Sequence, residues 1–241
     1  MRGKASLLCL LVLFSFVVGV ASAKYFDNSS QINSTDPEIS ISNDYLIAYV
    51  ETSESGGGVG TFTLKTKNGY DLLYTSRDHN AWSSYLTVQV DNKNYTTGII
   101  AGYGNPISMS QYVEQYPMII DDSIITKWRL PENMVVIQKL SLVGEACEFN
   151  LTIINEGDQD RNVKVRYLFD YQVRDQDGAP IILWRNGERE ILKYETEYSG
   201  DEINFDYWLT RDYLDSTYTL QGKHIIRGFG ATPPDEIIFA N

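Results

Sequence analysis

The stretch YLFDYQVRDQDGAP holds the residues whose types and spacing suggest chemistry most directly. Asp175 and Asp177 are two residues apart and Gly178 follows them, a spacing that calcium loops use to bring oxygen ligands together. An EF-hand is excluded, because Ala179 stands at its third acidic position and no helices are expected around the loop. An ordinary Asp/Gly turn after a strand, capped by Pro180, explains the same residues and is the favoured interpretation. The alternative is one structural calcium ion bound by Asp175 and Asp177.

Groups that could act as catalysts at neutral pH are few. The only histidines are His79, in a polar loop, and His224, in a strand-like run where a packed side chain is the commoner explanation. Paired carboxylates could serve glycan chemistry, but no spacing in the sequence singles out one pair. Cys147 alternates inward among aliphatic residues and is expected to be an inert core thiol. We therefore assign no catalytic residue and no cofactor, and we regard an enzyme as the less favoured class.

Aromatic residues in a loop-like stretch offer a second kind of site. GYGNPISMSQYVEQYP contains Tyr103, Tyr112 and Tyr116. A long connection over a sheet often carries binding residues, and exposed rings beside polar groups suit a sugar ligand. The alternative is that these rings fill the core or cover the edges of a sandwich. The three tyrosines are the candidates for carbohydrate binding.

Residues 1–23 have the pattern of a secretory signal peptide. Arg2 and Lys4 precede a long apolar run, and the small residues of ASA end at Ala23. An uncleaved anchoring helix is the alternative, because about 20 apolar residues can span a bilayer. We expect cleavage after Ala23 and export to the cell surface or the medium.

Four N-x-S/T sequons agree with export. Asn28 and Asn33 lie in a polar segment, residues 24–40, that reads as a solvated linker. Asn94 lies in a turn, and Asn150 lies on the polar face of an alternating strand. The formal net charge of -12 argues against nucleic acid and anionic lipid as partners. The expected partner is a component of the cell envelope or a polysaccharide.

Strand signals fill the remaining chain, and no stretch after residue 23 has helical periodicity. Asn68-Gly69 and Asn186-Gly187 each predict a two-residue hairpin turn. About a dozen short strands predict an all-β, antiparallel β-sandwich as a single domain over residues 41–241. The clearest alternating runs are 61–66, 84–90, 147–153 and 163–169, and the runs 134–143 and 179–184 are apolar enough for strands buried on both faces.

The last apolar run, Ile237–Phe239, predicts one more strand beside the chain end. An uncovered strand edge invites association, so we expect either that something else covers this edge or that the chain is a shortened version of a longer protein. Assembly through the C-terminal edge strand is one way to cover it.

The order of several motifs resembles a group of secreted archaeal and bacterial β-sandwich proteins of mostly unassigned function. These motifs are ISNDYLIAYV, GTFTLKT, NGYDLLY, VKVRYLFDY, DQDGAP and PDEIIFA, and the resemblance covers about Ile41–Asn241. It implies a shape distantly similar to the supersandwich of galactose mutarotases, with further strands after PDEIIFA, and it carries over no catalytic residue. We expect an exported glycoprotein domain with a structural or adhesive role that includes carbohydrate binding. The alternative is a glycan-active enzyme of mutarotase-like fold.

Overall fold

The computed structural model describes residues 9–18, 37–54, 56–76, 81–98, 105–185, 187–212, 220–228 and 231–240. These residues form twenty β-strands and two short 3-10 helices, and they contain no α-helix. Several antiparallel sheets pack together, which confirms the expected all-β, sandwich-like fold. Within the same residues, no helix has the length and apolar character needed to cross a membrane.

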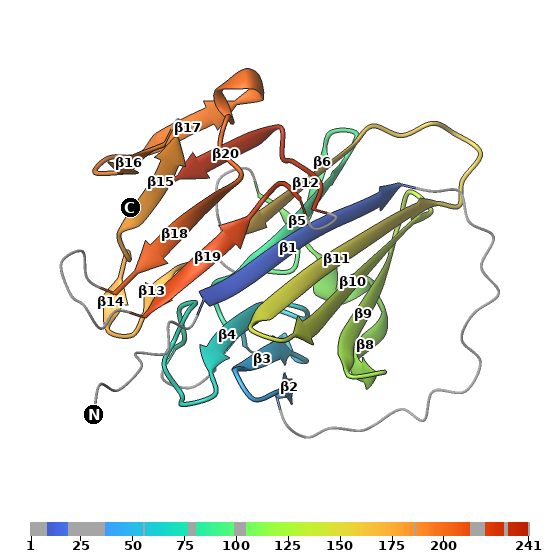
Figure 1. Ribbon diagram of the computed structural model, residues 1–241. Helices are drawn as coiled ribbons and strands as arrows, with labels where there is room; N and C mark the ends of the chain where they lie inside the picture. Colours follow the sequence, from blue (N-terminus) through green and yellow to red (C-terminus); the bar gives the residue numbers. More distant parts are fainter. Residues whose placement is uncertain are drawn as a thin grey trace.

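A nine-stranded sheet forms one layer of the fold (Figure 1). All its neighbouring strands pair antiparallel, except that β1 is parallel to both of its neighbours. In spatial order the strands are β16 (Glu188–Ile191), β15 (Ile181–Arg185), β18 (Tyr207–Arg211), β19 (Gln221–Ile225), β1 (Cys9–Val18), β11 (Ala146–Asn155), β10 (Met134–Val143), β9 (Ser123–Leu130) and β8 (Val113–Ile120).

Strand β1 is the apolar core of the segment that the sequence predicts to be a signal peptide. Its backbone register pairs Val12 with Cys147 of β11 and with His224 of β19. Strands β11 and β19 therefore run in the same direction on either side of one strand position. Cleavage after Ala23 remains a prediction, and it would leave that position open to another strand.

Smaller sheets pack against the nine-stranded sheet on the side of Cys147, Phe149 and Leu151. One has the order β2 (Glu38–Ser42), β3 (Leu46–Glu51) and β4 (Phe62–Thr66). Another has the order β12 (Val163–Leu168), β5 (Tyr85–Val90), β6 (Lys93–Thr96) and β7 (Ile107–Ser108). The remaining elements are the pair β17 (Thr196–Ser199) and β20 (Glu236–Phe239), the hairpin β13 (Gln172–Val173) and β14 (Gln176–Asp177), and the 3-10 helices η1 (Met109–Tyr112) and η2 (Gly200–Glu202).

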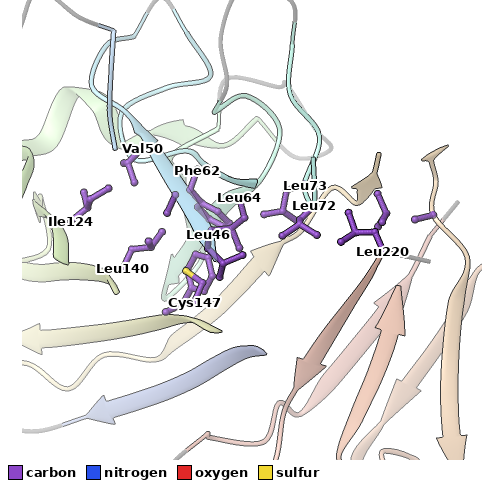
Figure 2. Close-up of a cluster of buried hydrophobic side chains, with 14 residues drawn as sticks. Leu46, Val50, Phe62, Leu64, Leu72, Leu73, Ile124, Leu140, Cys147 and Leu220 are labelled. Carbon is purple, nitrogen blue, oxygen red and sulfur yellow. The ribbon is translucent and has the colours of Figure 1, made fainter. Parts of the chain in front are cut away.

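Each smaller sheet buries its own apolar cluster against the large sheet. The cluster under β3 and β4 includes Leu46, Phe62 and Cys147, with Leu72 and its neighbours extending it to one side (Figure 2). The Phe62 ring lies 4.7 Å, centroid to centroid, from that of Phe149 on β11. Burial raises the pKa of the Cys147 thiol well above its usual range, as expected for an inert core cysteine.

The strand predictions agree with the structure closely. The apolar run 134–143 coincides with β10, although only Met134–Val136 are buried on both faces and Lys139 is exposed, so burial on both faces was wrong for its second half. The pairing of Arg185 with Glu188 leaves the expected two-residue turn between β15 and β16. Gly187 has the positive φ that its turn requires. The two-residue turn expected at Asn68-Gly69 was wrong by one residue, because the N–H of Thr66 donates to the C=O of Tyr70 (2.8 Å) and the loop therefore spans residues 67–69. Gly69 has the positive φ with which such a three-residue loop ends.

Alanine substitutions at two glycines distinguish the cost of backbone strain from the cost of a steric clash. Gly60 and Gly69 have φ of 93° and 85°, but a Cβ on Gly60 would lie 2.4 Å from Cζ2 of Trp128, whereas a Cβ on Gly69 meets nothing within 4 Å. We expect Gly69→Ala to lower the free energy of unfolding by about 1 kcal/mol through its φ alone. Gly60→Ala should lower it by a further ~1–3 kcal/mol, because Trp128 is fully buried and cannot retreat. Urea unfolding measures both, and equal losses would contradict the role of this contact.

Candidate functional site

An open cleft separates β12 from β20. Within the described residues β12 pairs only with β5, and β20 pairs only with β17. Residues 166–171 and 236–240 line a cavity of about 500 Å³. A second cavity, of about 1090 Å³, lies between residues 163–166 and residues 232–236. The two cavities share Arg166 and Glu236 in their walls, so they adjoin each other beside β12 and β20, and together they are called the cleft.

Aromatic rings form much of the cleft wall. Tyr167, Phe169 and Tyr171 follow one another at every second position, and the Phe169 and Tyr171 rings are nearly parallel at 6.3 Å. Trp208 of β18 and Phe239 of β20 meet edge to face at 5.2 Å. Rings packed in this way present a rigid apolar surface to whatever enters the cleft.

His224 lies behind this wall and is almost completely buried. Its ring stacks on Trp208 at 5.1 Å, the Tyr171 hydroxyl is 3.3 Å from Nδ1, and the Thr210 hydroxyl is 3.1 Å from Nε2. Burial lowers the pKa of His224 to about 3, so the imidazole is neutral at physiological pH. The interpretation of His224 as a packed histidine is confirmed, whereas His79 lies outside the described residues.

Asp170 is a half-buried acidic group in the cleft wall, next to the aromatic rings. Its backbone is fixed, because its N–H donates to Ser84 Oγ (3.0 Å) and its C=O accepts from the N–H of Tyr74 (2.7 Å). Partial burial raises the pKa of the Asp170 carboxyl, and the charge of nearby Asp177 raises it further. The half-buried carboxyl could anchor a polar group of a ligand beside the aromatic wall.

Asp175 and Asp177 lie in the β13–β14 hairpin. Both side chains are exposed, and Asp177 pairs with Gln172 across the hairpin. The neighbouring Arg174 forms a 3.1 Å ion pair with the buried Asp212. Across the part of the chain that the structure describes, no group of three or more His, Cys, Asp or Glu side chains could hold a metal ion. Asp175 thus occupies the expected turn, whereas Asp177 lies in strand β14. The calcium ion remains a prediction with no third acidic ligand among these residues.

The structure does not gather the tyrosines that the sequence suggested for carbohydrate binding. Tyr103 lies outside the described residues. Tyr112 ends η1 and packs edge to face against Tyr95 at 5.9 Å, so its ring is half-buried. Tyr116 lies on β8 and is 58% exposed. Neither Tyr112 nor Tyr116 lines the cleft.

A network of charged side chains adjoins Tyr116. Glu114, two residues earlier on β8, accepts hydrogen bonds from Lys127 (2.6 Å) and Arg129 (2.8 Å). Arg129 also pairs with Glu156. An exposed ring and charged donors and acceptors on one strand are features that a sugar ligand can use.

The two sequons that the structure describes lie on different sheets. Asn94 was expected in a turn, but the turn is residues 91–92 and Asn94 lies in β6, paired with Gln89 of β5. Its side-chain oxygen accepts a hydrogen bond from Gln89 (2.9 Å). Asn150 is in β11 and alternates with the buried Phe149 and Leu151, as the sequence pattern predicts. Both asparagines are half-buried, and glycosylation at these positions and at Asn28 and Asn33, which lie outside the described residues, remains a prediction.

The cleft itself was missed from the sequence. The alternation in VKVRYLFDY correctly predicts that Tyr167 and Phe169 face a core, and continuing that alternation would have included Tyr171. No local pattern, however, places residues 232–240 opposite β12. The pairing of distant segments across the cleft is a property of the fold alone.

Comparison of the chain with models of known protein families, with curated proteins and with solved structures found no match. The resemblance to secreted β-sandwich proteins and to the mutarotase supersandwich therefore remains a prediction.

His224 predicts a specific loss of stability in acid. A histidine in the unfolded chain titrates near pH 6.5 and buried His224 near 3, so the unfolded state binds more protons between these values. The stabilisation is complete above pH 6.5 and is lost as the pH falls toward 3, by at most about 5 kcal/mol. His224→Phe keeps a ring beside Trp208 but cannot titrate, so its melting temperature should fall less steeply between pH 6.5 and 4. Parallel curves for the two proteins would contradict this assignment.

Proposed function

We propose that the protein is an exported glycoprotein domain with a structural or adhesive role at the cell surface, and that it associates with an envelope component through the cleft. The cleft between β12 and β20 carries this proposal, because it combines two strand edges with an aromatic wall. Strand edges and exposed apolar surface are the features through which β-proteins associate. The signal-like segment 1–23, the sequons and the negative charge support an extracellular setting.

The rim of the cleft adds exposed apolar surface. Ile238 is 51% exposed on β20, whereas its neighbours Ile237 and Phe239 are buried against β15 and β18. An isoleucine left at a strand edge gains little from folding and much from being covered by a partner. Its position beside the aromatic wall makes the rim part of the same association surface.

We expect Ile238→Arg to reduce binding of the protein to its own cell envelope by at least about tenfold. An arginine replaces the exposed apolar rim with a charge, so a partner that packs on this rim must desolvate it. Val143→Arg is the matched control, because Val143 is 55% exposed at the end of β10 and lines neither cavity. The measurement is the fraction of native-source protein that sediments with washed envelopes. Equal sedimentation of both variants and the wild type would refute association through the cleft.

Carbohydrate binding is a second candidate function, and Tyr116 with the Glu114–Lys127–Arg129 network favours it. The exposed ring could stack on a sugar, while the charged groups are already held in place by one another. This surface lies on β8, at the far edge of the nine-stranded sheet from β16. Carbohydrate binding on β8 is therefore separable by mutation from association through the cleft.

Tyr116→Ala should weaken binding to envelope polysaccharide by roughly five- to tenfold, about 1 kcal/mol, through loss of ring stacking. Tyr194→Ala is the control, because Tyr194 is 81% exposed and lies outside this network. Affinity electrophoresis in polysaccharide gels measures the retardation of each protein. A binding domain should leave the reducing ends of the polysaccharide unchanged, whereas a glycan-active enzyme would alter them. Equal retardation of the two variants would show that Tyr116 does not contribute to polysaccharide binding.

A further inference from the structure

We propose that the cleft between β12 and β20 is an acceptor site for a single β-strand, supplied by an extended polypeptide segment that runs antiparallel to both edges. The inference rests on the proposed function, which makes the cleft the association surface, and it adds the chemical class of the partner. Strand addition to a sheet edge is a general mode of peptide recognition, in which backbone hydrogen bonds provide the affinity.

The two edges run in the same direction along the cleft. The arrows of β12 and β20 point in the same direction in Figure 1. Residues of both strands also line the same two cavities. Residue numbers thus increase together on both walls. A strand that is antiparallel to β20 is consequently antiparallel to β12 as well. Because β17 is antiparallel to β20 and β5 is antiparallel to β12, the added strand would join two separate sheets into one antiparallel sheet.

The backbone groups on the β12 side can be assigned from one hydrogen bond. The N–H of Asp91 donates to the C=O of Asn162 (2.8 Å), so the backbone N–H and C=O of Asn162 point toward β5. In an antiparallel pair every second residue faces the partner strand and the residues between face away. The N–H and C=O groups of Val163 and Val165 therefore point into the cleft.

The β20 side is assigned in the same way. The N–H of Gly200 donates to the C=O of Asp235 (3.0 Å), so the backbone N–H and C=O of Asp235 point toward β17. By the same alternation, the backbone groups of Glu236 and Ile238 point into the cleft. Both walls thus present backbone donors and acceptors at every second residue, which is the spacing that a strand, rather than a sugar chain, can match.

The side chains around the cleft specify the pattern of the added strand. On the inner face Val165 of β12 and Ile237 of β20 pack toward the core. On the outer face Lys164 and Glu236 are exposed. A strand between them would place every second side chain between apolar neighbours and the others in water. The partner segment should therefore alternate apolar and polar residues.

A tethered strand tests the site directly. We would extend the chain by a glycine, so that Asn241-Gly forms a two-residue turn, followed by about seven alternating valine and threonine residues at ~3.3 Å each. A second extended variant exchanges the valines and threonines, which turns the apolar face outward. One of the two extended variants should melt about 5 °C above the unextended protein, and the other should not. In the stabilised protein, amide exchange should slow by at least about 100-fold at Val163, Val165, Glu236 and Ile238.

The outcomes separate the inference from the proposed function. Protection on both β12 and β20, together with loss of envelope binding by the stabilised protein, supports a strand-acceptor site. If amides are protected on β20 alone, or in neither of the two extended variants, the inference is overturned. If Ile238→Arg still abolishes envelope binding in that case, the cleft remains the association surface and its partner is not a strand. Release of the protein from envelopes by soluble polysaccharide, without any effect of the tethered strand, would identify a glycan partner instead.

Discussion

The hydrogen-bonding requirement of strand edges is the constraint on which this structure depends. Every residue of a strand except proline carries a backbone donor and an acceptor, and each group must find a neighbouring strand, a side chain or water. The nine-stranded sheet satisfies most of these groups in its interior, and the smaller sheets cover its apolar face. The cleft lies where two of the smaller sheets end, and there the edges of β12 and β20 have no strand between them among the described residues.

The same constraint applies to the position of β1. Its pairings with β11 and β19 are the only parallel ones among the described strands of the large sheet. Strands β11 and β19 have the same direction, so an antiparallel strand would fit the position equally well and would match the rest of the sheet. Removal of residues 1–23 on export, as the sequence predicts, would leave Cys147 and His224 beside an open strand position. The interior of the large sheet and the cleft would then both depend on strands from elsewhere.

Local patterns in the sequence predicted the strands, because alternation and turn chemistry act over a few residues. The run 134–143 coincides with β10, and Asn186-Gly187 stands where β15 turns into β16. The packed state of His224 also followed from its apolar surroundings. The sequence could not show that residues 232–240 lie opposite β12, because that depends on the order of strands in space. Tyr116 was proposed because its stretch looked loop-like, but it lies in strand β8. The charged network on the same strand joins residues from β8, β9 and the loop after β11, which no local pattern shows.

Amide hydrogen exchange along β20 in the unmodified protein tests the central claim most directly. The backbone N–H and C=O of Ile237 point toward β17, whereas those of Ile238 point into the cleft, although the two residues are adjacent in one short strand. The structure predicts that the amide of Ile237 is protected and that the amide of Ile238 exchanges close to the rate of an unstructured chain. Strong protection of both amides would mean that the outer edge of β20 is already covered, and the account of an open cleft would be wrong.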